Sequence, residues 1–256
     1  MFNKIFTLLL FNCIILKIAL SAEESFLLID GKSSEIVLEI GSHIDERETP
    51  RSTFKIALSL IGFDSGILQD ENNPVWQYQE GYDDYLESWK RPQTPLSWIK
   101  NSCLWFSKRL AERLEMHNFQ FYLTALDYGN QDASGGLTNA CWLTSLKISP
   151  REQVTFIQKM LQHKHPVSSY AIQMTRQLLF LEELPNGWKL FGKTGSGFSN
   201  QPDGKNELGW FVGWVEKGDD FLPFAYKIRE NKIDPQLRIP RVKQFLVESE
   251  LRKHLG

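Results

Sequence analysis

Apolar and polar positions along the chain predict β-strands near both of its ends. Two short apolar runs, 25–29 and 35–40, flank an Asp-Gly pair, which is typical of a β-hairpin. Three further apolar runs, 188–192, 209–215 and 221–228, are separated by loops that contain Gly, Asn or Asp. We therefore expect these five strands to form one sheet that both ends of the chain help to build.

Between the two groups of strands, apolar residues recur every three to four positions, which predicts helices. The clearest helix N-terminus is Ser149-Pro150-Arg151-Glu152, which has the pattern of a capping box. Residues 64–95 have no such period and predict an irregular connector whose aromatic side chains pack internally. Helices are expected over 52–62, 97–114, 149–161, 168–181 and 241–255. Together these elements predict a mixed α/β fold: an antiparallel β-sheet flanked by helices, with an inserted all-helical lobe.

The length of 256 residues suits one large domain that carries a lobe. We expect a single domain over 22–256, with a sheet region of about 22–63 plus 185–256 and a helical lobe of about 64–184. The formal net charge is −2 and no basic run occurs, so we expect no nucleic-acid partner.

Residues 1–21 have the pattern of a signal peptide. Lys4 supplies a positive start, 5–16 is mainly apolar, and small residues precede Ala22. The apolar run is too short for a stable membrane span, and Lys17 interrupts it. We therefore expect export, to a bacterial periplasm, and no membrane span after cleavage.

Cysteine and histidine usage indicates neither a disulfide framework nor a metal site. After removal of the leader only Cys103 and Cys141 remain, either as one disulfide or, as we favour, as two buried thiols. His163 and His165 are the closest histidine pair, and no carboxylate cluster accompanies them. We expect them to be exposed at a helix end, and we expect no bound metal.

The helix expected from residue 52 carries a short polar stripe on an apolar body. Ser52, Lys55 and Ser59 fall on one face, and Lys55 is the only charge between Arg51 and Asp64. A desolvated lysine loses its proton more readily, and a neutral amine one turn from a serine can accept the hydroxyl proton during attack. The plainer interpretation is a helix-start serine followed by a solvated lysine.

Four short motifs occur in one order: Ser52-x-x-Lys55, Ser102-Cys103-Leu104, Tyr128-Gly129-Asn130 and Lys193-Thr194-Gly195. Ser102 is expected within a helix, and Lys193-Thr194-Gly195 at a strand end before a glycine-rich turn. The chain thus resembles the class D (oxacillinase-type) serine β-lactamases, whose pattern is S-x-x-K, S-x-V, Y-G-N and K-T-G. The resemblance extends from about Ser25 to the C-terminus and implies a serine β-lactamase/transpeptidase-like fold. The class A pattern is not met, because no Ser-Asp-Asn occurs.

The resemblance implies catalytic roles for five residues. Ser52 would attack the lactam carbonyl, and Lys55, carbamylated by CO2 to N6-carboxylysine, would be the general base for acylation and deacylation. Trp142, in a loop after Tyr128-Gly129-Asn130, would donate its indole N–H to the carbamate. Ser102 would relay a proton to the lactam nitrogen, and Lys193 would assist electrostatically. Apart from CO2 or bicarbonate, no separate cofactor is expected.

The resemblance also implies a substrate site. Thr194 and Arg238 would hold the substrate carboxylate, although the nearby Arg241 stays open as an alternative. The backbone N–H groups of Ser52 and Ser196 would form the oxyanion hole. Two positions depart from the family pattern: Leu104 stands where Val is usual, and Arg51 where a small residue is often found. Loop contours around Trp98, Leu143 and 196–206 would set the substrate preference.

These residues predict hydrolysis of the β-lactam ring of penicillin-type antibiotics through a serine acyl-enzyme, which confers antibiotic resistance. The alternatives are a penicillin-acylated sensor domain and a penicillin-binding transpeptidase without efficient turnover. The expected partner is a β-lactam small molecule, and the protein would be a monomer or a homodimer.

Overall fold

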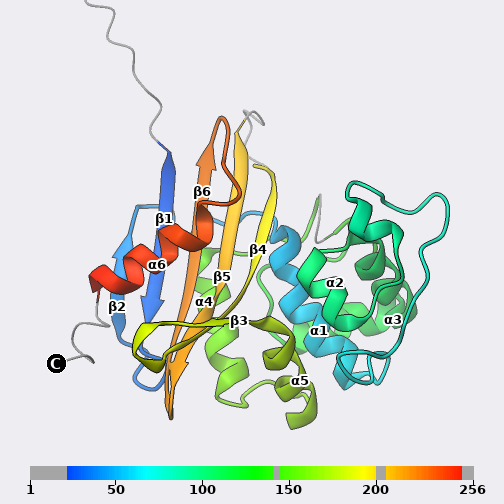
Figure 1. The fold of residues 1–256 in the computed structure, drawn as a ribbon, viewed down its shortest axis with the longest axis horizontal. Helices are drawn as coiled ribbons and strands as arrows, with labels where there is room; N and C mark the ends of the chain where they lie inside the picture. The colour runs from blue at the N-terminus through cyan, green and yellow to red at the C-terminus, as the bar shows by residue number, and fades with distance from the viewer. Residues whose placement is uncertain (1–21, 141–143, 200–205, 250–256) are drawn as a thin grey trace, which may run out of the picture.

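The computed structural model describes residues 22–140, 144–199 and 206–249. Six strands form one antiparallel sheet, in the spatial order β2-β1-β6-β5-β4-β3. The N-terminal hairpin is confirmed, and its first strand pairs with β6, so that Phe26 lies opposite Tyr226. The strands are β1 (Glu23–Ile29), β2 (Ile36–Ile40), β3 (Phe180–Glu183), β4 (Lys189–Phe198), β5 (Glu207–Lys217) and β6 (Asp220–Glu230). Both ends of the described chain therefore contribute to the same sheet (Figure 1).

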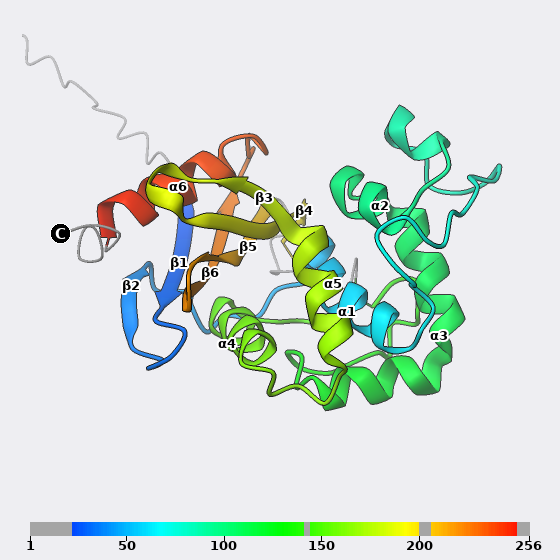
Figure 2. The same cartoon turned by 60° about the horizontal axis from the view of Figure 1, so that its bottom comes forward.

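Helices cover both faces of this sheet (Figures 1 and 2). Helix α6 (Arg238–Ser249) packs on one face, where Phe26 lies 4.9 Å from Phe245 between ring centroids. Helix α4 (Pro150–Leu161) packs on the other face against β6, β1 and β5. Because both faces are covered, successive residues of the central strands are buried, and the strands appear in the sequence as continuous apolar runs.

The remaining helices form a body beside the sheet, on the side of β4 (Figure 1). A 3₁₀ turn, η1 (Arg51–Phe54), leads into α1 (Lys55–Asp64), which contacts α5, α3 and β4. The other elements are η2 (Glu87–Lys90), α2 (Pro95–Asn101), α3 (Leu104–Ala125), α5 (Ser169–Leu179) and η3 (Pro185–Gly187). Every residue of α1 from its start to Phe63 is buried, as expected for a helix that is apolar on nearly all sides.

Several sequence predictions are confirmed. Helix α4 begins with the expected capping box: the Ser149 hydroxyl accepts from the Glu152 N–H, and the Glu152 carboxylate accepts from the Ser149 N–H. Such a cap stabilises a helix by about 1 kcal/mol. The connector 64–95 is irregular apart from η2, and it contains the isolated bridge between Trp76 and Gln93.

Other predictions are wrong at element boundaries. The helix expected over 97–114 is two helices, because Ser102 adopts a left-handed conformation between α2 and α3. Helix α5 ends at Leu179, and the chain continues as the edge strand β3, which the apolar period did not predict. Gly62 does not end α1, which continues to Asp64. A glycine at this position allows Leu68 to pack closely, because a Cβ there would meet the Leu68 side chain at 2.7 Å.

Strand β4 is longer than expected and continues through Phe198. The glycines at 195 and 197, which suggested a turn, instead allow another segment of the chain to lie close to the backbone of β4. A Cβ on Gly195 would lie 3.1 Å from the Pro50 carbonyl oxygen and 3.3 Å from the Ser52 nitrogen. Strand β4 can therefore lie directly beside the turn that begins α1.

His165 is also placed differently from the prediction of an exposed helix end. It is buried, and its Nε2 lies 3.0 Å from the Phe156 carbonyl oxygen. Burial lowers the pKa of His165. None of the helices within the described ranges combines the length and the apolar character needed to cross a bilayer.

Candidate active site

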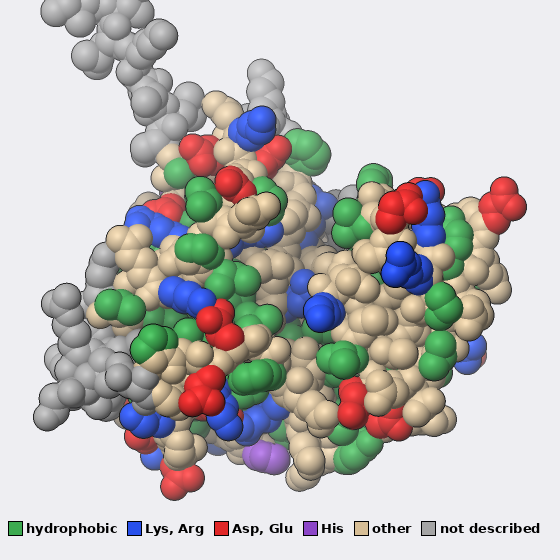
Figure 3. Space-filling model, viewed as in Figure 1, with side chains coloured by type: hydrophobic (Ala, Val, Ile, Leu, Met, Phe, Trp, Pro, Cys, Tyr) green, Lys and Arg blue, Asp and Glu red, His purple; other side chains and the backbone are tan. Residues whose placement is uncertain are grey.

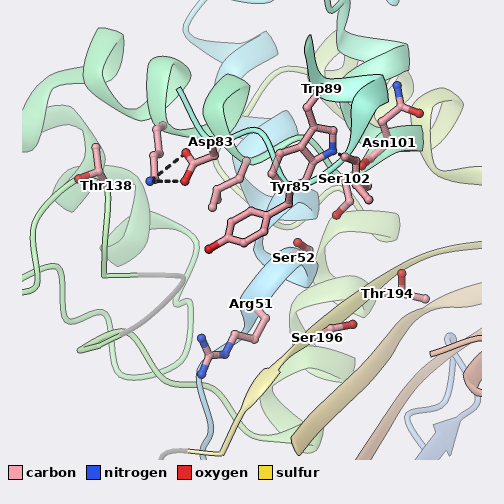
Figure 4. A pocket seen from close by; sticks show the side chains of 13 residues that line it. Arg51, Ser52, Asp83, Tyr85, Trp89, Asn101, Ser102, Thr138, Thr194 and Ser196 are labelled. Atoms are coloured by element: carbon pink, nitrogen blue, oxygen red, sulfur yellow. Dashed lines mark hydrogen bonds and ion pairs between the residues drawn. The ribbon is translucent and has the colours of Figure 1, made fainter. Parts of the chain in front are cut away.

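A cavity of about 500 Å³ lies between the start of α1, strand β4, and the helices α2 and α3. In the space-filling view the surface is indented between the sheet and the helical body (Figure 3). The side chains that line the cavity come from segments far apart in the sequence (Figure 4). They are Arg51, Ser52, Asp83, Tyr85, Leu86, Trp89, Asn101, Ser102, Leu104, Lys108, Thr138, Thr194 and Ser196.

Ser52 and Lys55 lie together beneath this cavity. Ser52 is half-buried and faces the cavity, whereas Lys55 has 0% of its surface exposed. The Lys55 Nζ lies 3.3 Å from the Ser52 Oγ, which is within reach for a hydrogen bond. The turn is held from behind, because the Gln153 amide donates to the Thr53 hydroxyl (2.9 Å), which in turn donates to the Pro50 carbonyl (2.6 Å). The turn η1 and the first residue of α1 thus place an alcohol and an amine side by side.

Ser102 reaches the cavity from the break between α2 and α3. Its φ of 54° and ψ of 33° make it the left-handed cap of α2, and its N–H donates to the Ile99 carbonyl (3.2 Å). This conformation turns the chain, so that both Ser102 and Leu104 line the cavity. Cys103 between them is a fully buried free thiol, and burial raises its pKa to about 11.

Strand β4 contributes Lys193, Thr194 and Ser196. Thr194 and Ser196 line the cavity, and they lie within the strand rather than at its end. Lys193 is 6% exposed and donates to the Thr194 carbonyl at 3.1 Å. Its burial, and then the charges of Lys55 and Arg238, hold the pKa of Lys193 well below the usual value. The two buried lysines are therefore electrostatically coupled.

Arg238, at the start of α6, lies behind strand β4. It is 5% exposed; its guanidinium donates to the Gly195 carbonyl and, at 3.4 Å, to the Trp210 carbonyl. Burial lowers the pKa of Arg238 to about 10. Arg238 lines a neighbouring hollow of about 370 Å³ that shares Ser196 with the main cavity. The alternative, Arg241, forms an ion pair with Glu24 at 2.7 Å.

Several residues at the cavity were missed by motif reasoning. Tyr85, expected to pack internally, is 82% exposed and forms part of the cavity wall. Asp83 and Lys108 form an ion pair at 2.9 Å on the same wall. Nothing in the sequence period of 64–95 could have placed Tyr85 and Asp83, because that segment is a connector that packs against α3.

Three predicted residues, Trp142, Leu143 and Cys141, lie outside the described residues. Trp98, expected near the substrate, is fully buried and donates its indole N–H to the Ser107 hydroxyl at 2.8 Å. Among the described residues there is no group of three or more His, Cys, Asp or Glu side chains that could hold a metal ion.

Comparison with known proteins identifies the family. The penicillin binding protein transpeptidase domain matches residues 25–245. The chain is 40% identical to "Beta-lactamase OXA-9" of Klebsiella pneumoniae over 190 residues, which cover 70% of this chain and 69% of that protein. It is 37% identical to "Beta-lactamase OXA-1" of Escherichia coli over 201 residues, which cover 75% of this chain and 71% of that protein.

A solved structure is similar over nearly its whole length. The crystal structure of the OXA-427 class D β-lactamase superposes with a TM-score of 0.84 at 37% identity, covering 90% of this chain and 99% of that one. The chain therefore belongs to the penicillin-binding transpeptidase domain family and, within it, to the class D serine β-lactamases.

Proposed function

We propose that this protein hydrolyses the β-lactam ring of penicillin-type antibiotics through a serine acyl-enzyme and so confers resistance to them. The observation that carries the proposal is the pair at the start of α1. A fully buried Lys55 amine lies 3.3 Å from the Ser52 hydroxyl, which faces a cavity of about 500 Å³. A cavity of this size suits a small-molecule substrate.

In the acylation step, the Ser52 Oγ attacks the lactam carbonyl carbon. Its proton passes to the Lys55 side chain, and the carbon–nitrogen bond of the ring breaks. Ser102, across the cavity, delivers a proton to the lactam nitrogen, and Lys193 assists electrostatically. The backbone N–H groups of Ser52 and Ser196 stabilise the oxyanion. Gly195 supports this role, since the lack of a side chain there lets β4 lie against the Ser52 nitrogen.

In the deacylation step, a water molecule attacks the acyl-enzyme and its proton is taken up at the same Lys55 position. Carbamylation of Lys55 fits the site, because only a neutral amine adds CO2 and full burial disfavours the ammonium form. The modification would supply an anionic oxygen base at neutral pH. Trp142 as its hydrogen-bond donor and Leu143 as part of the substrate rim stay predictions.

The substrate carboxylate would be bound on the β4 side of the cavity. Thr194 supports this placement with its hydroxyl in the cavity wall, and the guanidinium of Arg238, which donates to the Gly195 carbonyl, adds positive charge behind it. Arg238 is favoured over Arg241, because Arg238 contacts β4 directly whereas Arg241 is paired with Glu24. Arg238 would then attract the substrate carboxylate through its positive charge behind Thr194. It would also hold β4 in place through its hydrogen bond to the Gly195 carbonyl.

Two further properties complete the proposal. The leader pattern of residues 1–21 supports export to a bacterial periplasm, where a β-lactamase would meet its substrate. The protein would act as a monomer or a homodimer, as expected from the sequence.

Turnover of a chromogenic cephalosporin, measured with and without added bicarbonate, tests this function. We expect many turnovers per enzyme molecule and faster steady-state hydrolysis with bicarbonate. A single stoichiometric burst, with the acyl-enzyme persisting by mass spectrometry, would instead identify a penicillin sensor or a slow transpeptidase.

A further inference from the structure

The turn that carries the nucleophile has a strained backbone. Arg51, directly before Ser52, has a positive φ of 54°, a conformation that residues other than glycine rarely adopt. Such a conformation persists only where the surrounding structure holds it in place. The position of Ser52 therefore depends on the contacts that η1 makes with the rest of the fold.

A series of buried hydrogen bonds holds this turn from outside the cavity. The Pro50 carbonyl accepts from the N–H (3.2 Å) and from the hydroxyl (2.6 Å) of Thr53. A hydroxyl has one proton, so the Thr53 oxygen can only accept in its other contact. The Gln153 amide of α4 supplies that donor at 2.9 Å. Thr53 is fully buried, Gln153 is 1% exposed, and neither side chain lines the cavity.

The surroundings of Gln153 indicate that its amide serves this one hydrogen bond. Its amide oxygen is buried and has no hydrogen-bond partner among the described residues. A buried polar atom without a partner destabilises the fold, whereas an apolar side chain of the same length would fill the same space without that cost. The N–H group that reaches Thr53, rather than packing, therefore accounts for a glutamine at this position.

The Pro50 carbonyl is also the point at which η1 meets strand β4. A Cβ on Gly195 would lie 3.1 Å from the Pro50 oxygen and 3.3 Å from the Ser52 nitrogen, so the two backbones are in direct contact. The proposed oxyanion hole takes one N–H group from each of these segments, that of Ser52 from η1 and that of Ser196 from β4. The separation of the two donors thus depends on the position of the Pro50 carbonyl.

We propose that Gln153 is a positioning residue that sets the geometry of the oxyanion hole from outside the cavity, through its hydrogen bond to Thr53. This inference rests on the proposed function, since it assigns how the same site stabilises its transition state. The oxyanion forms only when the Ser52 oxygen attacks. Displaced donors should therefore slow acylation without weakening the binding of the intact substrate.

Single-turnover reactions with enzyme in excess over a chromogenic cephalosporin separate these two effects, because the colour changes when the ring opens. The maximal rate measures acylation, and the half-saturating enzyme concentration measures binding. We expect Gln153→Met to lower the maximal rate about 10-fold and to change the half-saturating concentration by less than about 2-fold, as a small displacement at the reacting centre would. Its urea midpoint should not fall, because the variant also removes the amide oxygen that lacks a partner.

The same helix provides a matched control. Gln158 also lies on α4 and is largely buried, but its amide donates to the Gly31 carbonyl (3.1 Å) and to the Ser34 hydroxyl (2.8 Å), between β1 and β2. We expect Gln158→Met to leave the maximal rate of acylation unchanged, even where it lowers the urea midpoint. The two glutamines of one helix would thus differ in their effect on the reaction.

Thr53→Val breaks the same series of hydrogen bonds at its other end and serves as the test where Gln153→Met does not fold. We expect the same selective loss of maximal rate, because the hydroxyl is removed while the side chain keeps a similar shape. Thr53→Ser restores the hydroxyl and should restore most of the rate. The double variant Gln153→Met/Thr53→Val should lose no more than Thr53→Val alone, since both changes break one connection.

An unchanged maximal rate in Gln153→Met, or in Thr53→Val where the former does not fold, would overturn the inference. Equal losses in Gln153→Met and Gln158→Met would also overturn it, because α4 would then act only as a general support. A loss of rate in Gln153→Met that is matched by a lower urea midpoint would do the same. Failure of the unaltered protein to open the cephalosporin ring would count against the proposed function itself and is thus a distinct result.

Discussion

Lys193 and Lys55 are both buried, and the charge of Lys55 helps to hold the pKa of Lys193 below its ordinary value. Burial is the larger cause, and the charge of Arg238 adds to it. The protonation state of one lysine therefore depends on the chemistry of the other. A neutral or anionic side chain at position 55 would remove part of the repulsion and raise the pKa of Lys193.

This coupling predicts a link between bicarbonate and the alkaline limb of the pH profile. If protonated Lys193 is needed for the proton relay, activity falls as the pH rises through its pKa. Carbamylation of Lys55 replaces a positive or neutral group with an anion, which raises that pKa. We expect saturating bicarbonate to move the alkaline limb of kcat/KM to higher pH. A limb that stays in place while the maximal rate increases would show that the two lysines act independently.

Ser102 provides a test that separates chemistry from backbone conformation. Its left-handed φ of 54° costs a non-glycine residue about 1 kcal/mol. We expect Ser102→Gly and Ser102→Ala to lower kcat/KM by similar factors, about 100-fold or more, because both remove the hydroxyl that would relay the proton. Denaturant unfolding should nevertheless find Ser102→Gly about 1 kcal/mol more stable than Ser102→Ala. Near-normal activity in Ser102→Gly would remove the hydroxyl from the mechanism.

A buried lysine away from the active site predicts how stability depends on pH. Lys227 is 1% exposed, donates to the backbone carbonyls of His43 and Glu46, and has a pKa lowered to about 8 by burial. Between pH 8 and 10 the unfolded chain keeps this proton while the folded protein loses it, so stability should rise with pH. The contribution of Lys227 to this slope should be on the order of 1 kcal/mol per pH unit.

Urea unfolding at pH 7, 8, 9 and 10 measures the slope, and the difference from Lys227→Met isolates the part due to Lys227. The comparison is needed because Lys193, whose pKa is also lowered, adds to the rise, whereas Cys103, whose pKa is raised to about 11, opposes it. The window ends at pH 10, because Tyr122 has a pKa raised to about 12 and destabilises the folded state as unfolded tyrosines ionise above pH 10. Parallel profiles for the unaltered protein and Lys227→Met would mean that Lys227 is solvated in solution.

Sequence patterns predicted those elements that depend only on residues close together in the chain. The capping box of α4 and the β1–β2 hairpin were found because a few adjacent residues determine each of them. The order of four short motifs predicted a site, and the fold brings Ser52, Ser102 and Thr194 around one cavity. Each motif alone is weak, so the common order was the informative signal.

Contacts between distant segments could not be predicted in the same way. The glycines at 195 and 197 suggested a turn, because the sequence does not reveal that the start of α1 passes beside them. Ser102 was expected within a helix, because its apolar neighbours keep a helical period across the break. Tyr85 and Arg51 line the cavity only through the tertiary fold, and no period or spacing encodes that position.

In the proposed mechanism, the buried amine of Lys55 accepts the proton in both halves of the reaction. The decisive measurement of this role is intact-mass spectrometry of Lys55→Ala, followed for hours after mixing with benzylpenicillin. We predict that the variant either keeps its unmodified mass or gains the mass of one penicillin and retains it. An adduct that forms and disappears at the rate of the unaltered enzyme would exclude this role, because both steps would then proceed without Lys55.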